Sequence, residues 1–124
     1  MAKATLIARL LLGLIFFVFG LNGFFMFISP PPPAPAAGEF LSAMINTGYL
    51  FPVVKLIEVI CGAALLAGVY VPLALVVLAP IVVNIVLFHA FLDPAGLVMG
   101  GLAMVLLIFL AWQHRARYQG LFSL

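Results

Sequence analysis

The sequence is short of charged residues, and this shortage decides its class. Only 6% of the 124 residues are charged and 68% are hydrophobic, with a mean hydropathy of +1.42. A water-soluble domain needs many more polar residues to cover its surface. The formal charge of +2 is too small for a nucleic-acid-binding surface. Lipid must therefore cover most of the molecule. This predicts a multi-pass protein of the cell (inner) membrane, in contact with the lipid bilayer.

Cysteine and the other groups that carry chemistry are equally scarce. The single cysteine, Cys61, excludes an internal disulfide and a CxxC redox pair. Neither a Gly-rich phosphate loop nor a nucleophile elbow is present, and metal-binding side chains are too few at one level for a zinc or di-iron site. His89 and His114 are expected about a bilayer apart, which argues against haem ligation by both. The sequence thus predicts no catalytic residue and no metal site, and favours a chain that is not an enzyme on its own.

Long hydrophobic runs fill most of the chain. A hydrocarbon core of about 30 Å needs about 20 helical residues to cross it. The stretches of suitable length are residues 4–28, 50–68, 73–92 and 95–114. A break at Gly68, Tyr70 and Pro72 separates the second run from the third. We therefore predict a single all-α domain over residues 1–124, a polytopic bundle of four transmembrane helices.

The connection between the first two runs has two parts. Residues 29–38 contain five prolines and are expected to form a polyproline II segment outside the hydrocarbon. Residues 39–48 place Phe40, Leu41 and Met44 at helical spacing. This pattern predicts a short interfacial helix in the first outer loop, closed by Gly48.

Small residues at helical spacing mark candidate contacts between helices. In lipid, packing comes from close backbone approach rather than from hydrophobic exclusion. The candidate pairs are Gly13 with Gly20, Ala64 with Gly68, and Gly96 with Gly100. Contacts within the bundle are the favoured interpretation, and contacts between copies in a homo-oligomer are the alternative.

The start of the last run carries a capping signal. Asp93 is an expected N-cap, and Pro94 fits the first helical position. His89 stands four residues before Asp93, a spacing that a metal pair on a helix would also have. Because Pro94 and a helix end follow, capping is the favoured interpretation.

Charge position predicts the orientation. Basic residues lie near the two ends of the chain, and acidic residues lie in the two loops on the other side: Lys3, Arg9, Arg115 and Arg117, against Glu39 and Asp93. The positive-inside rule then places both termini in the cytoplasm. This orientation needs an even number of crossings, which agrees with four.

A set of polar side chains stands out because lipid tolerates such groups poorly. Lys55 and Glu58 are three residues apart and can form an ion pair on one helix face. The candidate ligand-binding residues are Lys55, Glu58, Asn22, Asn84 and His89, all expected in the outer half of the membrane. Asn84 and His89 lie about 140° apart around a helix, which argues against one shared cavity.

Two interpretations of this set stay open. In the structural one, Lys55 snorkels to the headgroups with Glu58 as its counter-ion, the asparagines join helices, and His89 caps its helix. In the functional one, the set forms a ligand-binding or proton-handling site.

The order and spacing of several motifs resemble the DoxX-like family of small bacterial membrane proteins. The motifs are residues 8–20 (ARLLLGLIFFVFG), 48–62 (GYLFPVVKLIEVICG), 72–75 (PLAL) and 84–89 (NIVLFH). The resemblance covers nearly the whole chain, and the segment with Lys55, Glu58 and Gly62 is its most specific part. It implies a compact four-helix membrane bundle. The proline run is a departure that the resemblance does not explain.

The resemblance also suggests where to look for a function. The family takes its name from a subunit associated with a thiosulfate:quinone oxidoreductase, and other relatives look linked to oxidative-stress complexes or to the assembly of membrane proteins. The resemblance therefore implies at most a membrane subunit of a quinone-linked oxidoreductase, because the chain has no soluble redox portion.

Two hypotheses from different classes follow. The favoured one is a DoxX-like subunit that binds a quinone or lipid-like molecule at the outer polar cluster. The alternative is a non-enzymatic scaffold or assembly factor whose partner is another membrane protein. A small transporter is less favoured, because the sequence shows no repeat and no broken helix at the midplane.

Overall fold

The computed structural model describes residues 2–29 and 32–122, and every regular element in these residues is helical. The elements are α1 (Ala2–Phe25), α2 (Pro35–Asn46), α3 (Leu50–Ala67), α4 (Val71–Phe91), the short 3-10 helix η1 (Pro94–Gly96), α5 (Leu97–Gln113) and the 3-10 helix η2 (Arg115–Phe122). Within the described residues, α1, α3, α4 and the combined η1 and α5 are the four helices long and apolar enough to cross a membrane. The predicted all-α fold with four such spans and a short helix after the first is confirmed.

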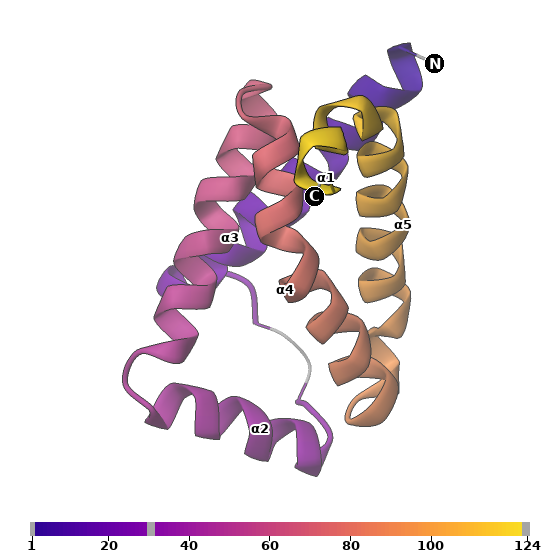
Figure 1. Ribbon diagram of the computed structural model, residues 1–124. Helices are drawn as coiled ribbons and strands as arrows, with labels where there is room; N and C mark the ends of the chain where they lie inside the picture. Colours follow the sequence, from indigo (N-terminus) through magenta and orange to yellow (C-terminus); the bar gives the residue numbers. More distant parts are fainter. Residues whose placement is uncertain (1, 30–31, 123–124) are drawn as a thin grey trace.

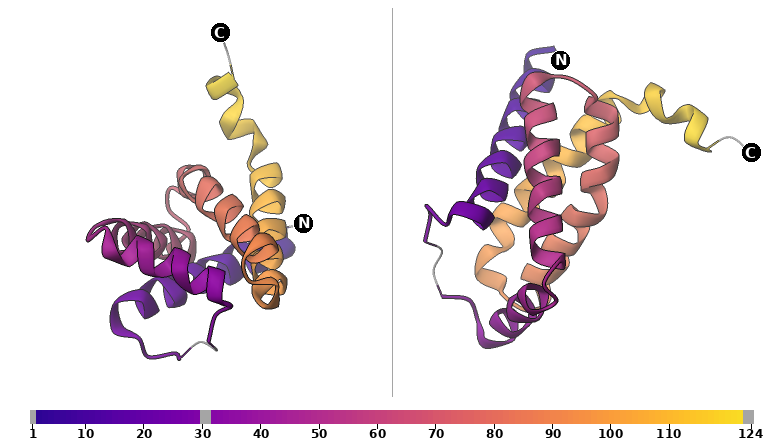
Figure 2. Two further views of the ribbon diagram at one scale, coloured as in Figure 1. Left: turned by 90° about the horizontal axis from the view of Figure 1, so that it is seen from below. Right: turned by 90° about the vertical axis from the view of Figure 1, so that its left-hand side faces the viewer.

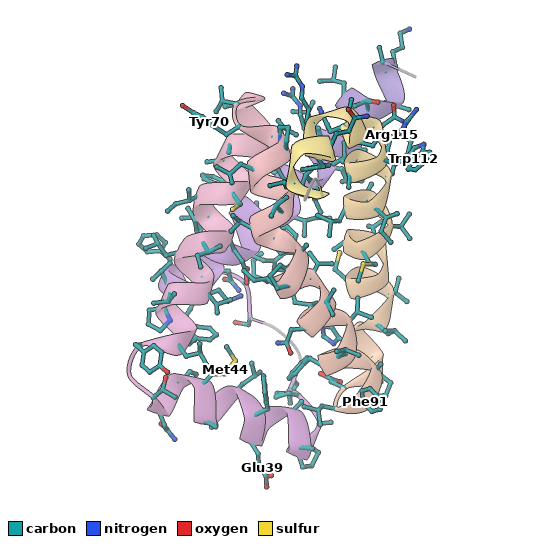
Figure 3. All side chains as sticks on the ribbon, in the orientation of Figure 1. Glu39, Met44, Tyr70, Phe91, Trp112 and Arg115 are labelled. Atoms are coloured by element: carbon teal, nitrogen blue, oxygen red, sulfur yellow. The ribbon has the colours of Figure 1, made fainter. Side chains whose placement is uncertain are left out.

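The long helices run alternately up and down, and α2 crosses one end of the bundle (Figure 1). We call this end the α2 end. The opposite end, where α1 begins and α5 finishes, is the terminal end. Figure 2 shows the same crossing of α2 from two further sides, and shows η2 leading away from the bundle. Tyr70, Trp112 and Arg115 lie at the terminal end and Phe91 at the α2 end (Figure 3).

Glycines bring α1 and α3 into close contact. A Cβ atom added to Gly62 would stand 2.5 Å from the backbone nitrogen of Phe17 and 2.9 Å from the carbonyl oxygen of Gly13. One added to Gly20 would stand 2.9 Å from the backbone nitrogen of Val59. The predicted contact face of Gly13 and Gly20 is thus confirmed, with α3 as its partner. Only residues without a side chain let two helix backbones approach so closely.

The predicted GxxxG pair joins α5 to α4 within the same bundle. Gly96 lies directly against the ring of His89, and a Cβ atom on Gly100 would meet His89 Cδ2 at 3.3 Å and Ile85 Cγ2 at 3.4 Å. The neighbouring Gly101 faces open space, with nothing within 4 Å of an added Cβ. The largest fully buried side chains between the helices are those of Leu12, Leu65, Leu75, Leu78, Leu110 and Val82.

In the third expected small-residue pair, Ala64 packs against the buried core, whereas Gly68 lies just beyond the end of α3. Gly68 ends α3 in the left-handed conformation, with φ of 75°, and its amide bonds back to the carbonyls of Ala64 and Leu65. The guanidinium of Arg9 lies against Gly68. The glycine therefore serves the turn between α3 and α4, where a positive φ is needed.

The first helix ends earlier than hydropathy suggested. α1 stops at Phe25, and Met26 takes a positive φ of 51°. The side chain of Asn22 accepts a hydrogen bond from the Ile28 amide at 2.7 Å and donates one to the Ile28 carbonyl at 3.1 Å. These bonds hold the chain in a reversal that competes with another helical turn.

The first loop also differs from expectation, because α2 begins at Pro35 and not at Glu39. Pro35 occupies an initial helical position, where its missing amide costs nothing, and the Gly38 amide donates to the Ala34 carbonyl at 2.9 Å. Residues 35–38 are therefore helical and not polyproline II. Residues 30 and 31 of the expected proline segment lie outside the described residues.

The expected side-chain cap at Asp93 is also absent. No hydrogen bond from the Asp93 side chain caps η1, although the Gly96 amide donates to the Asp93 carbonyl at 3.2 Å. The chain makes one 3-10 turn from Pro94 to Gly96 before α5 starts at Leu97. The turn positions Gly96 against the ring of His89.

Candidate functional site

A cavity of about 450 Å³ lies between the helices at the α2 end. All of the long helices and α2 contribute to its wall. The lining residues are Ile15, Phe16, Phe19, Phe40, Leu41, Met44, Phe51, Val54, Lys55, Glu58, Pro80, Ile81, Asn84, Ile85, Phe88, His89, Met99, Gly100 and Ala103. The wall is therefore apolar except for Lys55, Glu58, Asn84 and His89, which are among the residues selected from the sequence.

Lys55 and Glu58 form an ion pair on α3. Lys55 Nζ lies 3.4 Å from Glu58 Oε1, and the side chains are 21% and 5% exposed, respectively. The ammonium also lies 5.5 Å from the centroid of the Phe51 ring, within reach of a cation–π interaction. Because one of its three N–H groups faces Glu58, Lys55 keeps donor capacity for a ligand.

Asn84 brings an amide to the cavity from α4. Its side chain is exposed, although the residue lies seven positions before the end of a membrane-length helix. This amide forms no hydrogen bond with another described residue. A primary amide offers two donors and one acceptor, so Asn84 can recognise a polar group that enters the cavity.

His89 lies at the edge of the cavity nearest to α5. Its Nδ1 atom is 3.2 Å from the carbonyl oxygen of Asp93. A carbonyl oxygen can only accept, so in the neutral ring Nδ1 carries the proton and Nε2 has a free lone pair. The ring packs edge-on to Phe88, with centroids 5.1 Å apart, and lies against Gly96. This packing fixes the orientation of the imidazole.

The structure does not bring Asn22 to this cavity. Its amide is used in the two hydrogen bonds to Ile28 that end α1, and it is not part of the cavity wall. The structure also places Asn84 and His89 on one cavity despite their angular separation. The cavity is wide enough to contact α4 from Pro80 to His89, so two faces of this helix border it.

The contribution of α2 to the wall was missed from the sequence. Phe40, Leu41 and Met44 line the cavity, and the rings of Phe40 and Phe88 pack with their centroids 5.5 Å apart. In Figure 3, Met44 points from α2 toward the bundle and Glu39 points away from it. The signal was present, because these apolar residues stand at helical spacing, but the pattern was assigned to the membrane interface.

Taken together, the cavity places hydrogen-bonding groups on an otherwise apolar wall. It holds one cation, one carboxylate, one amide and one imidazole, and its size falls in the range of small-molecule sites, about 300–1,000 Å³. In a protein surrounded by lipid, such polar groups are costly unless they pair or bind something. The arrangement is suited to an amphipathic molecule with a polar head.

Comparison with known proteins gives the family. The sequence model described as DoxX matches residues 4–91, which cover nearly all of α1 and the whole of α2, α3 and α4. The chain belongs to the DoxX family. The match extends over each of the five polar residues discussed above. The resemblance inferred from the sequence motifs is thereby confirmed, and the chain is a DoxX-family membrane protein.

A relative of this DoxX-family protein occurs in Bacillus subtilis (strain 168). The uncharacterized protein YwoB is 31% identical over 121 residues, which cover 92% of this chain and 79% of the relative. The alignment therefore includes nearly all of the bundle. No solved structure matches the chain.

Proposed function

We propose that this DoxX-family protein binds a quinone or a closely related amphipathic molecule in the cavity at the α2 end, as the membrane subunit of a redox-linked complex. The observation that carries the proposal is the cavity of about 450 Å³ in which Lys55, Glu58, Asn84 and His89 interrupt an apolar wall. The link to a redox complex rests on the resemblance described above.

The four polar residues have distinct roles in this proposal. Lys55 donates a hydrogen bond to a carbonyl oxygen of the head group, and Glu58, 3.4 Å away, holds the ammonium in place. The Asn84 amide donates to a second oxygen. The free Nε2 of His89 accepts a hydrogen bond from a hydroxyl of the reduced head group, and would take up that proton when the head group is oxidised again.

Membrane embedding supports a lipophilic ligand. Asn84 is exposed within a membrane-length helix, so the cavity opens at a level where hydrocarbon surrounds the protein. A molecule that reaches Asn84 from the side must be soluble in lipid. A quinone combines that solubility with two hydrogen-bonding oxygens.

The proposal is tested by mass spectrometry of small molecules that co-purify with the protein in mild detergent. We expect a stoichiometric quinone-like or lipid-like molecule with the wild type, and its loss from Asn84→Leu, which places an apolar side chain in the cavity. Val83→Leu is the matched control, because Val83 is exposed and lies outside the cavity wall. Equal recovery from both variants would contradict the site. Recovery of one protein partner without any small molecule would instead favour the scaffold hypothesis.

A further inference from the structure

A second hollow lies between α3 and α4, closer to the terminal end than the cavity. It has a volume of about 280 Å³. Its wall consists of Ile57, Ile60, Cys61, Ala64, Tyr70, Leu73, Ala74 and Val77. We call it the α3–α4 groove. Apart from the Tyr70 hydroxyl and the Cys61 thiol, every side chain in this wall is a hydrocarbon.

The groove continues from the polar cavity along both helices. On α3, Glu58 of the cavity wall stands three residues before Cys61 of the groove wall. On α4, the cavity wall ends at Pro80, and the groove begins three residues away, at Val77. Residues three or four apart lie on one helix face. The walls of the two hollows therefore adjoin on both α3 and α4.

The packing of the helices explains why this seam is open. The close glycine contacts lie between α1 and α3, at Gly13, Gly20 and Gly62, and between α4 and α5, at Gly96 and Gly100. Among the described residues, no glycine within a helix faces another helix across the α3–α4 seam. Figure 1 shows α3 and α4 diverging from their connecting turn toward the α2 end. The space between them is thus narrow at the groove and wide at the cavity.

Small side chains on the floor of the groove leave space between α3 and α4. Its floor includes the small residues Cys61 and Ala74, which are buried, and the half-buried Ala64. Pro80 lies inside α4 near the junction of the two hollows. A proline at an interior helical position removes a backbone hydrogen bond and displaces the preceding turn. Larger side chains at the floor would close the groove.

We propose that one ligand occupies both hollows, with its polar head in the cavity and a single hydrophobic tail in the α3–α4 groove. This inference rests on the proposed function, and it defines the ligand as a single-tailed amphiphile. Asn84 and Leu73 are separated by about 16 Å along α4 at about 1.5 Å per residue. The tail therefore runs for about three helical turns toward the terminal end. A narrow groove of this kind holds one chain and not two.

The test compares two probes with the same head group. One is a dimethoxy-methyl-benzoquinone with a decyl tail, and the other is the same ring without the tail. Their dissociation constants are measured for the purified protein in the same detergent. Ala64→Phe fills the groove, and Ala63→Phe is the matched control, because Ala63 is exposed and lines neither hollow. Ratios of variant to wild type cancel the partitioning of each probe into the micelle.

We expect Ala64→Phe to weaken binding of the tailed probe about tenfold through lost van der Waals contact, and to leave the tailless probe within about twofold. Ala63→Phe should change neither. A second, milder variant guards against misfolding: Leu73→Ala removes an exposed side chain from the groove wall, and should weaken only the tailed probe, by about threefold. Val76→Ala, on an exposed position outside the groove, is its control.

The outcomes separate the two proposals. If neither probe binds the wild type, the proposed quinone site itself is wrong. If both probes bind and the groove variants affect them equally, the cavity holds the head but the tail lies elsewhere, and the groove proposal alone fails. The groove proposal also fails if Ala63→Phe has the effect expected of Ala64→Phe, because ordinary lipid contact would then account for it.

Discussion

Removing Lys55 should cost the protein more stability than removing Glu58, although the two side chains form one ion pair. Glu58 is only 5% exposed, whereas Lys55 is 21% exposed. Lys55→Met leaves a buried carboxylate without its partner, which costs about 3 kcal/mol in the free energy of unfolding. Glu58→Gln leaves an ammonium that can move toward the surface on its flexible stem, which costs about 1 kcal/mol.

The double variant isolates the interaction between the two charges. With Lys55→Met and Glu58→Gln combined, no charge is left unpaired, so the loss should fall back to about 1 kcal/mol. The double variant is then more stable than Lys55→Met alone by about 2 kcal/mol. Such recovery occurs only when the two side chains compensate each other.

Reversible unfolding in mixed micelles, followed by far-ultraviolet circular dichroism, measures these free energies. Lys3→Met is the control for loss of a positive charge, since Lys3 is exposed near the start of α1. It should change stability by less than about 0.5 kcal/mol. Additive losses across the two single variants and the double variant would refute the reasoning, and the proposed site would lose its central pair. The amount of ligand that co-purifies with the double variant then distinguishes a structural role of the pair from a binding role. If the pair is only structural, the double variant retains the ligand. If the pair binds the ligand, the double variant loses it.

Three further predictions concern the rest of the molecule. Gly100→Leu should lower the melting temperature more than Gly101→Leu, because a side chain on Gly100 meets His89 and Ile85 while Gly101 faces open space; equal losses would mean that the GxxxG contact is unimportant. Tyr118→Phe should cost about 1 kcal/mol, because the Tyr118 hydroxyl donates to the Pro72 carbonyl at 2.8 Å. Burial raises the pKa of Tyr118, so its contribution should be complete below its ordinary pKa and fall as the pH rises through the higher folded value; a Tyr118→Phe difference that persists at strongly alkaline pH would contradict this. Reporter fusions at the carboxyl terminus should be active in the cytoplasm and not in the periplasm, because the basic residues lie near the two chain ends; periplasmic activity would overturn the orientation.

The membrane spans could be predicted from the sequence because hydropathy over about 20 residues is a strong signal. Their ends could not, since local hydrogen bonds determine them. Asn22 ends α1 at Phe25 by holding the Ile28 backbone, and hydropathy does not detect such a bond. Pro35 was interpreted with the preceding prolines as part of an extended segment, but it starts α2.

The candidate site was predictable in its residue types and less so in its geometry. Lys55 and Glu58 were paired correctly because a separation of three residues places two side chains on the same face of a helix. Asn22 was included because its depth matched, yet depth says nothing about the direction of a side chain. The angular argument against Asn84 and His89 sharing a cavity assumed a narrow one, and the cavity borders α4 on two faces.

The glycine contacts between α1 and α3 have a consequence for synthesis. These two helices are the closest pair in the bundle, yet α2 and its flanking turns separate them in the chain. A ribosome adds roughly 5 to 20 residues per second, so about forty residues impose a wait of roughly 2 to 8 seconds before α3 is complete. During that interval α1 has only lipid, or a chaperone, to cover the face that carries Gly13 and Gly20. The best-packed seam of the bundle is therefore formed between segments that enter the membrane at different times.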